Sequence, residues 1–241
     1  MRSGFALEAP ISESLTAARL AFVAGAVDGL GYYSSGFFSA NMTGNVSLVS
    51  QQSALAHLRL LLPYVAIVVA FVVAAALTEL CLGLGRRRGV HYLYSYGIAT
   101  EGLLLTALGS ATLGDFIPNH GLELVVGLAA AMGLQNSLST SISGGRIRTT
   151  HLSGITTDIG IGLGALLSKV TSGEPACNVA DLAKLKLHVL TLVAFCAGGV
   201  AGVIGFRACG VSFLFGLSAV LLRFSIPGLT LSIALHSRME E

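Results

Sequence analysis

Long apolar runs separated by short polar stretches dominate this sequence. Six of them have close to the roughly 20 residues that an α-helix needs to cross a bilayer. Their approximate limits are 16–38, 60–83, 92–112, 121–142, 187–206 and 209–228. The pattern predicts an all-α polytopic membrane protein with six transmembrane helices. In the long connection 143–186, the apolar stretch 154–170 is expected to be a re-entrant helix, an interfacial helix or a further span.

A polar segment that contains a glycine occurs once in each half of the chain. The segment 41–45 (Asn-Met-Thr-Gly-Asn) follows the first apolar run, and 150–154 (Thr-His-Leu-Ser-Gly) follows the fourth, about 110 residues later. Three spans per half is an odd number, so duplicated halves would insert in opposite directions. The alternative is an old duplication retained only for folding. The predicted organisation is a tail at 1–14, three-helix repeats at 15–113 and 114–235, and a tail at 236–241.

Composition supports the membrane class. The chain is 54% hydrophobic and 11% charged, and its mean hydropathy is +0.80, whereas soluble domains carry roughly 25% charged residues. A net charge of +2 offers no basic field for nucleic acid. The four cysteines lack metal-ligand spacing, and no nucleotide or cofactor motif is present. We therefore expect no metal and no cofactor. The expected partners are the lipid bilayer and a small solute or ion, and a homo-oligomer is left open.

Basic residues predict the orientation. Cytoplasmic loops of membrane proteins collect Lys and Arg, and the run 86–88 (Arg-Arg-Arg) lies between the second and third spans. Placing it inside also places Arg148, Lys184 and most other basic residues at the inner side. The prediction is a multi-pass protein of the cell (inner) membrane with both termini in the cytoplasm.

Two acids fall near the middle of predicted spans. Asp28 lies in the first span and Glu101 in the third. A charge at that depth is costly, so such residues normally face a cavity or the bundle interior. They are candidates to share a proton or bind a cation, and the alternative for Asp28 is a packing hydrogen bond. Glu79 and Arg223, toward span ends, are expected to form an ion pair or to reach the interface separately.

The two polar segments supply further candidates for a solute site. Asn and Thr favour helix starts over helix interiors, and Gly44 and Gly154 are interpreted as helix breaks. Irregular backbone at membrane depth has to be buried in protein or line water, and such a break can hold a solute. The alternative is a capped turn outside the membrane. The predicted binding residues besides Asp28 and Glu101 are Asn41, Thr43, Asn45, Gln135, Asn136, Thr150, His151 and Asp158.

These motifs carry a resemblance to a known family. Segment 41–45, with Asp28 upstream in a Gly-rich run, and segment 148–154 (Arg-Thr-Thr-His-Leu-Ser-Gly) resemble the YoaK-like uncharacterised transmembrane proteins, the family of domain of unknown function 1275. The resemblance covers about 15–228. The second motif departs from the family pattern at His151 and Ser153, where Tyr or Val and Thr are expected. The resemblance implies a small integral membrane protein of bacterial type and implies no activity.

The sequence favours a small secondary transporter or permease over an enzyme. Inverted halves, polar helix breaks and intramembrane acids are typical of transporters, and coupling to protons through Asp28 or Glu101 is one form of this hypothesis. The alternative is a non-catalytic scaffold or accessory subunit. An intramembrane enzyme is a further alternative, but no spacing shows a nucleophile and a base on neighbouring helices.

Overall fold

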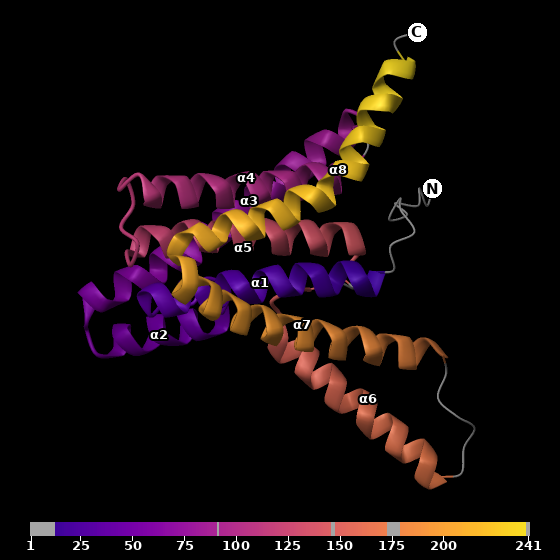
Figure 1. Ribbon diagram of the computed structural model, residues 1–241. Coiled ribbons are helices and arrows are strands. Elements are labelled where there is room, and N and C mark those ends of the chain that lie inside the picture. Colours follow the sequence, from indigo (N-terminus) through magenta and orange to yellow (C-terminus); the bar gives the residue numbers. More distant parts are fainter. Residues whose placement is uncertain (1–12, 91, 146–147, 173–178, 240–241) are drawn as a thin grey trace.

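The computed structural model describes residues 13–90, 92–145, 148–172 and 179–239, which form helices and connecting turns (Figure 1). The predicted all-α class is confirmed for this part of the chain. The α-helices are α1 (Glu13–Ser35), α2 (Met42–Ala54), α3 (Leu58–Arg87), α4 (Leu93–Leu113), α5 (Leu122–Ser143), α6 (Leu152–Ser172), α7 (Val179–Cys209) and α8 (Phe213–Met239), with a short 3-10 helix, η1 (Gly210–Ser212), between the last two.

The six apolar runs correspond to α1, α3, α4, α5, α7 and α8, and the stretch expected to be re-entrant or interfacial corresponds to α6. One segment treated as a loop, 39–58, contains the helix α2, which begins directly after the cap residue Asn41. Helix α7 begins eight residues before the predicted span, and α8 continues to Met239, into the segment predicted as a C-terminal tail. Apart from residues 13 and 14, the predicted N-terminal tail lies outside the described residues.

Helices from the two halves of the chain pair with each other. Helix α1 packs against α7, α3 against α5, and α4 against α8, while α2 lies against α3 and α6 against α7. Figure 1 shows α2 at one end of the molecule and α6 at the other. A bend in the second half of α8 coincides with Pro227, which removes one helical hydrogen bond.

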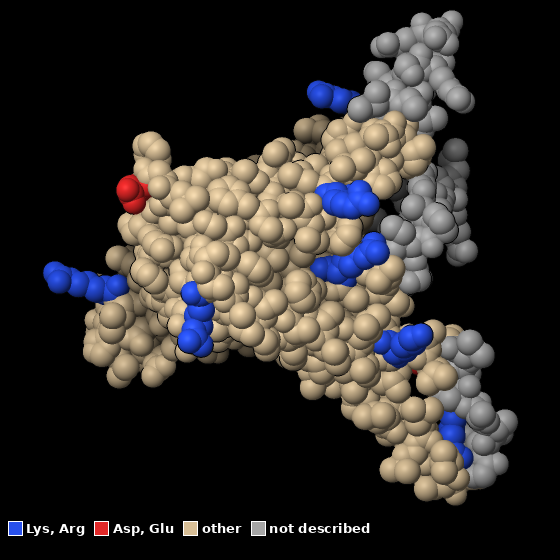
Figure 2. Space-filling model, viewed as in Figure 1, with Lys and Arg blue, Asp and Glu red and all other residues tan. Residues whose placement is uncertain are grey.

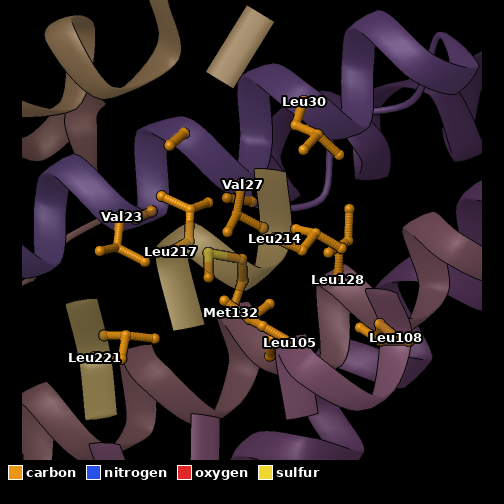
Figure 3. Packing of buried hydrophobic residues seen from close by; sticks show 14 of the residues in the cluster. Val23, Val27, Leu30, Leu105, Leu108, Leu128, Met132, Leu214, Leu217 and Leu221 are labelled. Atoms are coloured by element: carbon orange, nitrogen blue, oxygen red, sulfur yellow. The ribbon is translucent and has the colours of Figure 1, made fainter. Parts of the chain in front are cut away.

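The core lies where α1, α4, α5 and α8 meet (Figure 3). Val27 of α1, Leu105 of α4, Met132 of α5 and Leu217 of α8 belong to one cluster of buried side chains. Glycines set the spacing at the edge of this core: a Cβ at Gly29 of α1 would lie 2.7 Å from the carbonyl oxygen of Gly199 of α7. Small residues of this kind allow membrane helices to pack backbone against backbone.

The outer surface exposes many large apolar side chains. Side chains along α3 that are about half exposed include Val69, Val72, Leu77 and Leu80, and an apolar face of this extent is unusual for a protein surrounded by water. Among the described residues, three stretches are long and apolar enough to cross a membrane: Leu58–Arg87, Leu122–Ser141 and Ala180–Ser232, the last spanning α7 and α8. The protein is therefore a membrane protein, and the count of six spans stays a prediction.

Candidate functional site

The first helix break is held inside the bundle by Asp28. Helix α1 ends at Ser35, and Gly36 turns the chain with a φ of +79°. The Asp28 carboxylate accepts hydrogen bonds from the backbone N–H of Ala40 (2.7 Å) and the hydroxyl of Ser39 (3.3 Å). Asn45, fully buried in α2, donates to the carbonyl oxygen of Phe38 (3.0 Å). The break is thus tied to α1 and α2 through groups that would otherwise be buried without partners.

The second break is anchored in the same way from α5. The Gln135 amide donates to the hydroxyl of Thr149 (3.0 Å) and to the carbonyl oxygen of Leu20 in α1 (2.9 Å). Asn136 accepts a hydrogen bond from the hydroxyl of Thr150 (2.8 Å). Thr149 and Thr150 directly precede His151, the residue before α6, as Ser39 and Ala40 precede Asn41, the residue before α2. In each half, a polar group deep in the preceding helix holds the corresponding pair of residues.

This geometry supports the packing interpretation of Asp28. Its hydrogen bonds from Ser39 and Ala40 come from the loop before α2, and no hydrogen bond joins it to Glu101 among the described residues. The prediction that the two acids share a proton therefore finds no support in the contacts of either side chain. Depth along two helices could be counted from the sequence, but the direction in which each side chain points depends on how the helices are rotated against each other.

We expect Asp28→Ala to lower the free energy of unfolding by about 2–3 kcal/mol, because the buried N–H of Ala40 loses its acceptor. Asp28→Asn should cost much less, since one amide oxygen can still accept both hydrogen bonds. The stability of both variants is measured by thermal denaturation of the purified protein, with size-exclusion chromatography to detect the folded fraction. Equal destabilisation by Ala and Asn would show that the negative charge, rather than the hydrogen bonds, is required.

The motif glycines do not form the breaks. Gly44 and Gly154 lie in the first turns of α2 and α6, and neither has a positive φ. The side chain of Asn41 caps α2 by accepting from the Gly44 N–H (3.0 Å). A Cβ at Gly44 would lie 2.7 Å from the Asn41 side chain, and one at Gly154 would lie 2.9 Å from the His151 ring. Each glycine makes room for the side chain at the cap position. Thr43 is exposed beside this cap.

Glu101 lies alone in the core. Its side chain is fully buried in α4, and neither carboxyl oxygen has a hydrogen-bond partner within the described structure. The hydroxyl of Tyr94, seven residues earlier on α4, also has none. A buried carboxyl without partners costs stability in either protonation state, and more when charged. Because Glu101 lowers the stability of the fold and Asp28 supports it through hydrogen bonds, Glu101 is the stronger candidate for a functional role.

The expected pairing of Glu79 with Arg223 is wrong. Glu79 forms a salt bridge with Arg86 and accepts a hydrogen bond from the Ser141 hydroxyl. Arg86 lies seven residues later on α3, which is two helical turns and the same face. The position of both predicted partners near span ends did not reveal that α3 packs against α5 rather than α8.

A pocket of about 1020 Å³ opens between the start of α1, the turn after α5, α6 and the first half of α7. His151, Gly154 and Asp158 of the predicted set line it. Its other polar or charged lining side chains are Ser14, Arg148, Ser153, Thr157, Lys184, His188 and Thr191. Within the pocket, the Nε2 atom of His188 lies 3.7 Å from the Asp158 carboxylate, and Arg148 contacts the His151 ring at 3.3 Å. The volume suits a small-molecule ligand.

The predicted site residues therefore fall into separate groups. Three line the pocket, and five make the hydrogen bonds at the two breaks. Asn41, Thr43 and Gly44 lie at the start of α2, and Glu101 lies in the core. Sequence reasoning missed Lys184, His188 and Thr191 as pocket residues. They occur at intervals of three and four along α7, so a polar stripe at helical spacing was the available signal.

A family model described as protein of unknown function (DUF1275) matches residues 16–226. The chain belongs to this family. The membership that the two polar motifs implied is confirmed, and the match includes both breaks and every lining residue of the pocket except Ser14. Searches of curated proteins and of solved structures gave no match. Because the DUF1275 description assigns no activity, a function has to be argued from the geometry.

Proposed function

We propose that this DUF1275 protein is a small secondary transporter or permease, with two three-helix repeats inserted in opposite directions. The observation that carries the proposal is the matched anchoring of two helix breaks. Asp28 holds the residues before α2, and Gln135 and Asn136 hold the residues before α6. Broken helices at corresponding places of inverted repeats are typical of the substrate pathway in secondary transporters.

The helix packing supports an inverted relation between the halves. Suppose that α1 to α4 correspond in order to α5 to α8. The contact between α1 and α7 then corresponds to the contact between α5 and α3, and the contact between α2 and α3 corresponds to the contact between α6 and α7. The α4–α8 pair then lies across the symmetry axis. In Figure 1, α1 and α5 run in opposite directions, and α2 and α6 lie at opposite ends. This arrangement offers one break toward each face of the membrane.

The surface charge supports the orientation. Figure 2 shows a broad band almost without charged side chains, and more Lys and Arg side chains at the end where α1 and α7 begin than at the opposite end. Under the positive-inside rule, that end faces the cytoplasm. The pocket beside α6 then opens to the cytoplasm, and α2 lies toward the outer face.

Cysteine labelling should place α2 and the start of α7 on opposite sides of the cell membrane. In a variant without native cysteines, we expect Gln51→Cys in α2 to react with a membrane-impermeant maleimide added to intact cells. Lys184→Cys in α7 should react only after the cells are opened. Both positions are exposed, so accessibility depends on the side of the membrane. Labelling of both sites in intact cells would contradict the inverted topology.

Reconstitution tests the transport function directly. Proteoliposomes that contain a pH-sensitive dye should show solute-dependent flux with at least one member of a panel of organic anions, phosphate, amino acids, sugars and monovalent cations. Protein-free vesicles measure the leak, and Glu101→Gln tests proton coupling in the same vesicles. A well-folded protein that moves none of these solutes, and that co-purifies with a second membrane protein, would favour the accessory-subunit alternative.

A further inference from the structure

We propose that the pocket beside α6 binds an anionic group, a carboxylate or a phosphate. As an assignment of substrate class, this rests on the proposed transport function; as a binding site, it stands without it. The proposal starts from the side chains that line the pocket, which come from α1, the turn after α5, α6 and α7.

The charges in the pocket leave an excess of positive groups. Asp158 is the acid among the lining residues, and His188 lies 3.7 Å from its carboxylate. Arg148 and Lys184 also line the pocket, and neither forms a salt bridge within the described ranges of the chain. By contrast, Lys169 outside the pocket is paired with Asp181 (3.8 Å). Two cations and one acid in the same cavity leave a net positive charge, which favours an anionic ligand.

The start of α6 adds to this excess. In the first half of the protein, the Asn41 side chain accepts from the N–H of Gly44. The corresponding position in the second half is His151, and the N–H of Gly154 has no acceptor among the described residues. Gly154 and Ser153 both line the pocket. The N-terminal end of a helix carries partial positive charge and free N–H donors, which suit a carboxylate or phosphate.

The segment that carries Arg148 and His151 is fixed in place. Thr149, between them, is fully buried and hydrogen-bonded to Gln135, and Thr150 is hydrogen-bonded to Asn136. The guanidinium of Arg148 contacts the His151 ring at 3.3 Å. A guanidinium on an anchored segment can bind the two oxygens of a carboxylate or phosphate at once. The polar residues of α5 thereby position the anion-binding side chains as well as the break.

Ligand-dependent thermal stabilisation tests the site on the purified full-length protein, because a ligand specific for the folded state raises its melting temperature. Succinate and inorganic phosphate are the probes, and choline and glycerol at equal concentration are the controls. We expect stabilisation by at least one anion and by neither control. Arg148→Gln and Lys184→Gln should each weaken that binding about tenfold or more. Lys186→Gln, an equal loss of charge on an exposed α7 side chain outside the pocket, should leave the affinity within about twofold.

Nanodiscs distinguish a free anion from a lipid headgroup. In phosphatidylcholine nanodiscs the soluble anion should bind as in detergent, and added phosphatidylglycerol should leave its affinity unchanged. Competition by phosphatidylglycerol that depends on Lys184 would make a lipid headgroup the occupant and overturn the solute assignment. The anion site would be overturned if neither anion stabilised the protein, or if the two pocket variants and Lys186→Gln weakened anion binding equally. Anion binding without flux would reject only transport, whereas flux of a cation or neutral solute without anion binding would reject only this substrate class.

Discussion

Replacing Gly198 with Ala should separate α1 from α7 and destabilise the protein by about 3 kcal/mol, the upper part of the range for overpacking a well-packed core. A Cβ at this position would overlap the backbone carbonyl oxygen of Phe22. Backbone atoms cannot change rotamer, so the two helices have to move apart. Gly25 and Gly202 have the same kind of contact across this interface, with the carbonyl oxygens of Phe195 and Ala26.

The neighbouring glycine provides a matched control. A Cβ at Gly199 would lie 3.7 Å from the carbonyl oxygen of Gly25, an ordinary van der Waals distance. Gly199→Ala should therefore be neutral or stabilising by up to about 1 kcal/mol, because Ala favours the helix more than Gly does. Thermal denaturation in detergent measures both variants under the same conditions. Similar melting temperatures for the two variants would show that α1 and α7 do not pack as closely as the structure indicates.

Replacing Glu101 with Met should make the protein more stable and less active. Removal of a fully buried carboxyl without partners should raise the free energy of unfolding by about 1–3 kcal/mol. If Glu101 carries the coupled proton, proton-driven flux should be lost in both Glu101→Met and Glu101→Gln. Glu79→Gln is the control for removing an acid. Glu79 is half exposed and paired with Arg86, so its replacement should change stability by no more than about 1 kcal/mol and leave flux intact.

Reaction with a carbodiimide tests independently whether the Glu101 carboxyl is protonated in apolar surroundings. Dicyclohexylcarbodiimide reacts with protonated carboxyl groups in apolar surroundings and leaves an acylurea adduct. Mass spectrometry should find this adduct on the peptide that contains Glu101, and Glu101→Gln should remove it. A destabilised Met variant would mean that the carboxyl has a stabilising partner in the folded protein. Full proton-driven flux in the Met variant would exclude Glu101 as the coupling residue.

The two mid-membrane acids show how far a sequence argument reaches. Counting residues along the apolar runs placed Asp28 and Glu101 at similar depth, and both were candidates to share a proton or bind a cation, with Asp28 considered first. The structure separates them, because Asp28 has two donors from the loop before α2 and Glu101 has none. Whether a buried carboxyl is satisfied depends on which groups from other segments surround it, and a single sequence does not contain that information.

The break motifs show the same division. Asn41 was identified from the preference of Asn for helix starts, and the structure shows it as the cap of α2. Gly44 was interpreted as the break itself, but it lies in the first turn of α2 without a positive φ. The turns themselves use Gly36, Gly144 and Gly145, which have positive φ. They were not singled out from the sequence. In a chain with many glycines, the sequence does not indicate which of them adopt a positive φ or lie at a close contact between helices.

The sequence by itself determined the membrane class, the location of the main helices, the family and the polar segments that start α2 and α6. These features follow from hydropathy and local helix preferences. Both depend on residues within one helix length, so they can be summed along the sequence. Only the tertiary structure decided the partners of Asp28 and Glu79, the isolation of Glu101, and the meeting of Arg148, Asp158 and Lys184 in one pocket. Such contacts depend on the rotation and pairing of helices that are distant in sequence, and backbone contacts at glycines such as Gly198 fix that pairing.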